Sequence, residues 1–99
     1  MNSIIECASL EAVRGEIDRL DRQLVGLLAE RGAYVNQAAA FKHDSDAVRA
    51  PQRVEQVLAK VRELAREQGA EVAVVEAVYR AMIAAFIEVE LARHAQLDH

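Results

Sequence analysis

The first half of the chain carries a helical seam in which cations stand among apolar residues. Positions along this seam alternate in steps of three and four residues, the spacing of a helix face that packs against other helices. The seam consists of Arg14, Ile17, Asp21, Leu24, Leu28, Arg31, Val35, Ala38 and Lys42. A cation on a packed face needs an anion beside it. The pattern therefore predicts a long packed helix that binds an anion along one side.

The spacing of the three cations limits how they can act together. A helix rises 1.5 Å per residue, so Arg14 and Arg31 lie about 25 Å apart, and Arg31 and Lys42 about 16 Å. Two long side chains can span the shorter distance but not the longer one. If all three cations serve one site, Arg14 must come from a second copy of the chain. We therefore expect an obligate oligomer.

The composition favours a small helical domain. The 99 residues are 53% hydrophobic but only 4% aromatic, with four glycines and one proline. A core built from Ala, Val, Leu and Ile is typical of helices, and a chain of this length forms one domain, residues 1–99. The net charge of −4 argues against nucleic acid as the partner, because binding a phosphate backbone needs a basic face.

Other features of the sequence concern location and metal binding. Cys7 is the single cysteine, so no internal disulfide can form, and no Cys and His cluster has metal-ligand spacing. No basic segment followed by an apolar run opens the sequence, and no run approaches 18 apolar residues. We expect a cytoplasmic protein that binds neither a metal nor a membrane.

Capping signals and periodicity predict three helices, one long and two shorter. The first begins near Ser9 and runs to about Lys42, and the polar stretch His43 to Ala50 is predicted to be a loop. Pro51 suits the first turn of the second helix, which Gly69 ends. The third helix runs from about Glu71 to the mid-nineties and is apolar over more than half its circumference.

The seam cations and Glu90 are the candidate binding residues. A single Arg on a seam has a simple structural explanation, because it can reach solvent or pair with a nearby carboxylate. Three cations together suggest a dicarboxylate ligand, since Arg binds carboxylates in a bidentate manner and Lys supplies a point charge. Arg53, near the start of the second helix, either faces the same site or is solvated.

Glu90 lies among Phe86, Ile87, Val89 and Leu91 on the most apolar helix. A buried carboxylate must either meet a cation or keep its proton. Glu90 therefore forms a structural ion pair with an Arg of another helix, or acts as a neutral donor to the ligand. The histidines His43, His94 and His99 are expected at the surface.

The pattern R-x-x-I-D-x-x-D-x-x-L-x-x-L-L-x-x-R, from Arg14 to Arg31, is followed by Phe41-Lys42 and by Ala50-Pro51-x-Arg53-Val54. This pattern resembles the all-helical chorismate mutase family, and within it the small isochorismate pyruvate-lyases of salicylate formation. The resemblance implies an intertwined helical homodimer with two equivalent active sites, each using one Arg of the partner subunit. It also implies a pericyclic reaction that needs no cofactor.

The resemblance further implies a role for each candidate residue. Arg31 and Arg14 of the partner subunit would hold the two substrate carboxylates. Lys42 would contact the ether oxygen of the enolpyruvyl arm, and Arg53 would add positive field. Glu90 occupies a position where many relatives have Gln, whose amide donates to the ether oxygen. A carboxyl group donates only when protonated, so activity is expected to rise as the medium becomes more acidic.

Two further positions bear on the choice of substrate. Typical mutases of the family bind the ring hydroxyl of chorismate with acidic residues where this chain has Ala50 and Val54. The apolar pair favours isochorismate to salicylate and pyruvate, with chorismate mutase activity in the same site, whereas Glu90 departs from the lyase pattern. The alternatives are a chorismate mutase of aromatic amino acid biosynthesis and a non-catalytic helical dimer that senses a metabolite.

Overall fold

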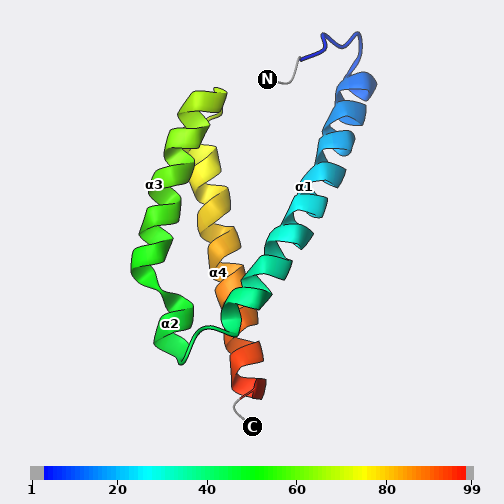
Figure 1. Cartoon of the computed structure of the whole chain (residues 1–99). Helices are drawn as coiled ribbons and strands as arrows, with labels where there is room; N and C mark the ends of the chain where they lie inside the picture. Colours follow the sequence, from blue (N-terminus) through cyan, green and yellow to red (C-terminus); the bar gives the residue numbers. More distant parts are fainter. Residues whose placement is uncertain (1–3, 98–99) are drawn as a thin grey trace. The chain divides into compact units, whose positions relative to one another are not determined.

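The computed structural model describes residues 4–97, and every regular element in that range is a helix. The helices are α1 (Leu10–Ala39), α2 (Ser45–Arg49), α3 (Pro51–Gln68) and α4 (Val72–Leu97) (Figure 1). Contacts divide the chain into two compact units, Met1–Tyr34 and Val35–His99. The predicted all-α class and the three predicted helices are confirmed, and α2 is an additional short helix. None of the helices described is both long and apolar enough to span a membrane.

Helix α1 begins where the sequence predicted and ends earlier. The Ser9 hydroxyl accepts a hydrogen bond from the Ala12 amide at 3.1 Å, as an N-cap residue does. At the other end, the Lys42 amide donates to the Ala39 carbonyl three residues before it, at 3.2 Å. Such bonds tighten the backbone and close the helix at Ala39. The predicted end near Lys42 is therefore wrong. Because Lys42 lies beyond the helix, the rise of about 1.5 Å per residue does not apply to the whole distance between Arg31 and Lys42.

The part of α1 in the first unit exposes a regular row of large apolar side chains, which we name the α1 apolar seam. Its members repeat in steps of three and four, the interval of a helix that packs along another helix. They are Leu10, Val13, Ile17, Leu20, Leu24 and Leu27, and their exposed fractions run from 40% to 62%. Within residues 4–34 no second helix is present to cover this row. Contiguous exposed apolar surface of this kind marks an interaction site.

In the second unit, α3 and α2 both pack against α4. Leu58, Val61 and Ala65 of α3 are buried and repeat at helical spacing, as the predicted apolar face of this helix requires. Val48 of α2 and Ala39 at the end of α1 are also buried. This small core holds α2 and α3 against α4.

The segment from His43 to Ala50, which was predicted to be a loop, contains α2. The Asp44 carboxylate accepts from the Ala47 amide at 2.8 Å and caps the helix. Ala50 ends it with φ 36° and ψ 64°, and its amide donates to the Asp46 carbonyl at 3.0 Å. Pro51 then starts α3, as predicted. Five residues are too few to show helical periodicity, which is why the sequence pattern gave no sign of α2.

The far end of α3 follows its capping residue. Gly69 has φ 71°, a left-handed conformation that glycine adopts without steric cost, and it ends α3 as predicted. Between the helices, the Glu76 carboxylate of α4 accepts from Arg62 of α3 and pairs with Arg80 at 3.5 Å. The Arg62 hydrogen bond is the main reason that the pKa of Glu76 lies below its usual 4.5.

Candidate functional site

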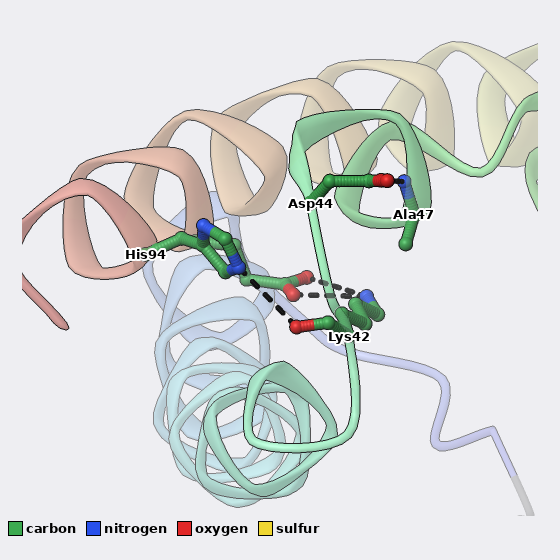
Figure 2. Close-up of polar contacts among 5 residues, drawn as sticks. Lys42, Asp44, Ala47 and His94 are labelled. Atoms are coloured by element: carbon green, nitrogen blue, oxygen red, sulfur yellow. Dashed lines mark hydrogen bonds and ion pairs between the residues drawn. The ribbon is translucent and has the colours of Figure 1, made fainter. Parts of the chain in front are cut away.

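The candidate site is built around Lys42, which lies three residues after the last residue of α1. Its amide completes the turn that closes α1, through the bond to Ala39. Its side chain and its carbonyl both reach α4, where they contact Glu90 and His94 (Figure 2). Glu90 and His94 are one helical turn apart, so they lie on the same side of α4. Lys42, which lies outside regular structure, is thus held against one face of α4.

Glu90 and Lys42 form a two-pronged ion pair. The Lys42 ammonium donates to Oε2 of Glu90 at 2.8 Å and to Oε1 at 3.2 Å. Glu90 is only 4% exposed, and the Lys42 side chain is 25% exposed. The interpretation of Glu90 as an ion pair therefore describes this structure, with Lys42 in place of the expected Arg. Donation by Glu90 to a ligand stays a prediction.

His94 was expected at the surface, but it is half-buried and hydrogen-bonded to the Lys42 carbonyl oxygen at 3.2 Å. A carbonyl oxygen only accepts, so Nε2 of His94 must carry the proton in this contact. Sequence reasoning missed this residue because its partner is a backbone atom 52 positions away. A weak signal was present, because His94 follows the anomalous Glu90 by one helical turn.

The predicted arginines lie on other parts of the chain. Arg14 and Arg31 belong to the first unit, where one continuous α1 separates them by about 25 Å. Arg53 lies in the first turn of α3 and is exposed. Ala50 and Val54 flank this turn. Lys42 and Glu90, both predicted site residues, are in direct contact in the second unit.

Chemically, an ammonium group fixed in direction is a donor that can stabilise negative charge on a ligand oxygen. Its buried carboxylate partner keeps it oriented and competes with a ligand for the same protons. This combination suits the binding of an anion and the stabilisation of a developing oxyanion.

Comparison with known proteins assigns the family. Residues 13–91 match the model described as chorismate mutase type II. The chain belongs to this family. A curated relative, the isochorismate pyruvate lyase of Pseudomonas aeruginosa, is 35% identical over 78 residues, which cover 79% of this chain and 77% of the relative. Family and relative together make the chain an enzyme of the chorismate mutase or isochorismate pyruvate-lyase type. The family match, residues 13–91, includes Lys42 and Glu90 but ends before His94.

Proposed function

We propose that this enzyme converts isochorismate to salicylate and pyruvate, and that chorismate is converted to prephenate in the same site. Both reactions break the C–O bond of the enolpyruvyl ether. In the lyase reaction a hydrogen moves from the ring to the departing side chain, and in the mutase reaction a C–C bond forms instead. Neither needs an external acid, base, oxidant or cofactor, so catalysis consists of holding a reactive conformer and stabilising charge on the ether oxygen.

The orientation of Lys42 is the observation that carries this proposal. Its ammonium is held by a carboxylate that is almost fully buried, at 2.8 Å and 3.2 Å from the two oxygens. A cation oriented before the substrate arrives needs little reorganisation in the transition state. Lys42 is therefore the residue proposed to stabilise the ether oxygen as the C–O bond breaks.

The remaining predicted residues receive binding roles in this proposal. Arg31 and Arg14 of the partner subunit bind the two substrate carboxylates, and Arg53 contributes positive field. The guanidinium groups of Arg31 and of Arg14 of the partner subunit each present parallel N–H donors that bind a carboxylate in a bidentate manner. Glu90 orients Lys42 in the free enzyme and donates to the ether oxygen once it is protonated.

The use of Arg14 of the partner subunit requires a homodimer, and two observations support one. The α1 apolar seam is exposed along the first unit. Helix α4 also exposes Val74, Val78 and Val89, by 60%, 56% and 49%. Surfaces of this kind are buried in stable assemblies. We propose that residues 1–99 form one domain that folds as an intertwined dimer.

The preference for isochorismate rests on Ala50 and Val54 and on the curated relative. Neither side chain can accept a hydrogen bond from a ring hydroxyl, so the contact that favours chorismate in typical mutases is missing. The corresponding physiological role is salicylate biosynthesis in a reducing cytoplasm, where the free thiol of Cys7 is stable. The second candidate, a chorismate mutase of aromatic amino acid biosynthesis, is favoured by the family match itself.

The test is to incubate the purified enzyme separately with isochorismate and chorismate and to measure salicylate plus pyruvate against prephenate. We expect a higher kcat/KM for isochorismate. A higher kcat/KM for chorismate would identify a mutase. If neither substrate is converted while both raise the melting temperature, the chain is a sensor and the proposal is wrong.

A further inference from the structure

His94 is a half-buried imidazole on α4 to which the family match gives no role, because that match ends at residue 91. Its Nε2 lies 3.2 Å from the carbonyl oxygen of Lys42 (Figure 2). It stands one turn beyond Glu90, so both residues address Lys42 from the same side of α4.

The contacts to Lys42 hold three different groups of that residue. The amide is held by the Ala39 carbonyl at 3.2 Å, the carbonyl by His94, and the ammonium by Glu90. Lys42 lies outside any helix, so ladder hydrogen bonds do not fix the backbone that follows its Cα. The hydrogen bond from His94 fixes the carbonyl side of the Lys42 backbone.

The two contacts from α4 differ in what happens when a substrate arrives. An ether oxygen or carboxylate that takes a proton of the Lys42 ammonium must compete with Glu90 for it. The backbone carbonyl of Lys42 does not contact the substrate in the proposed reaction, so the His94 hydrogen bond persists. A flexible four-carbon side chain can point in many directions unless its backbone is fixed.

We propose that His94 is a positioning residue that fixes the backbone of Lys42, so that the ammonium stays aimed at the ether oxygen after Glu90 has released it. This inference rests on the proposed function. A misplacement of about 1 Å costs up to about 10²-fold in rate, even when the residue responsible never touches the substrate. Removing the His94 hydrogen bond should lower kcat more than it raises KM, because the arginines still bind the substrate carboxylates.

Two substitutions separate positioning from simple packing. His94→Leu keeps an apolar body but removes the donor, whereas His94→Gln places an amide N–H as many bonds from Cβ as Nε2 is. With isochorismate we expect kcat of the Leu variant to fall by about 10-fold, while KM stays within about 2-fold. The Gln variant is expected to regain most of the lost kcat. Gln96→Leu, an exposed polar residue of the same helix, is the matched control and should keep wild-type kcat.

Melting temperatures are measured for all variants. If His94→Leu keeps wild-type kcat, or if His94→Gln loses as much kcat as His94→Leu while both remain folded, the inference is overturned. A fall in kcat that is matched by an equal rise in KM would also overturn it. Wild-type enzyme that converts neither isochorismate nor chorismate would instead reject the proposed function, and the role of His94 with it.

Discussion

At the scale of single residues, the chemistry proposed for this enzyme depends on the direction of the Lys42 ammonium. Removing a charge from water is costly, and the attraction between two buried charges offsets that cost only in good geometry with hydrogen bonds. Lys42 and Glu90 satisfy both conditions at 2.8 Å and 3.2 Å. Removing either partner therefore affects folding as well as catalysis, and tests of function must separate the two.

Lys42→Ala is expected to lower kcat by about 10²–10³-fold, because a preorganised donor to the ether oxygen is lost. Since Glu90 then lacks its cation, the double variant Lys42→Ala/Glu90→Gln serves as a reference without the orphaned charge. It should fold and be as inactive as the single variant. Lys60→Ala, at an exposed lysine of α3, is the control for loss of a cation. Steady-state kinetics together with circular dichroism check this, and substantial turnover by the folded double variant would contradict the role of Lys42.

Glu90→Gln tests how the carboxylate competes with the substrate. In the wild type, the Glu90 carboxylate holds the ammonium of Lys42 and competes with the substrate for it. Gln keeps an oxygen that accepts from Lys42 and adds an N–H donor, but it carries no charge. The variant is therefore expected to show a higher kcat/KM for isochorismate than the wild type. Glu88→Gln, an exposed acid on α4, should keep the wild-type kcat/KM. A kcat/KM of Glu90→Gln at or below the wild-type value would refute this explanation.

At the scale of elements, the junction between α2 and α3 has a backbone cost at Ala50. Its φ of 36° lies in the left-handed region, which costs about 1–2 kcal/mol for a residue with a Cβ. Ala50→Gly removes this cost but gains freedom in the unfolded chain, for a net stabilisation of about 0.5–1 kcal/mol. Urea unfolding measures it. Ala59→Gly, exposed within α3, should instead lose about 1 kcal/mol. Destabilisation by Ala50→Gly would show that the Ala50 side chain has a packing role.

The contact between α3 and α4 should depend on pH through Glu76. The pKa of Glu76 is lowered chiefly by its hydrogen bond from Arg62, so the ionised form is favoured in the folded chain. This contribution to stability is present above the usual value of 4.5 and is lost as pH falls through the lower, folded value. Glu76→Gln should therefore lower the urea midpoint at pH 7 but much less at pH 3. Glu67→Gln, exposed on α3, is the control. An equal difference at both pH values would exclude the ion pair as its cause.

The elements also show which features a sequence can predict. Ser9, Pro51 and Gly69 act through local backbone geometry, so the corresponding helix ends were predicted correctly. The end of α1 was placed too late because Ala40, Phe41 and Lys42 continue the helical pattern while their amides bond three residues back. For the site, an acid on an apolar helix indicated that Glu90 needs a partner. Its identity as Lys42, and the His94 contact, depend on non-local packing that no periodicity encodes.

At the scale of the whole molecule, we propose that two chains complete each active site. Within α1, Arg14 and Arg31 are about 25 Å apart, too far for both to hold one small dicarboxylate. The exposed α1 apolar seam supports a second chain as the source of Arg14. If each site uses residues of both chains, two inactivating substitutions can be placed on different chains of a heterodimer. One of the two sites then contains neither substitution and should be active.

The most direct measurement uses a heterodimer of an Arg14→Ala chain and a Lys42→Ala chain, co-expressed with different affinity tags and purified by both. One of its two sites combines intact Lys42 with intact Arg14 of the partner subunit. Each homodimeric variant should be nearly inactive, whereas the heterodimer should form salicylate from isochorismate at about half the wild-type rate per dimer. A heterodimer as inactive as its two parents would contradict the shared site.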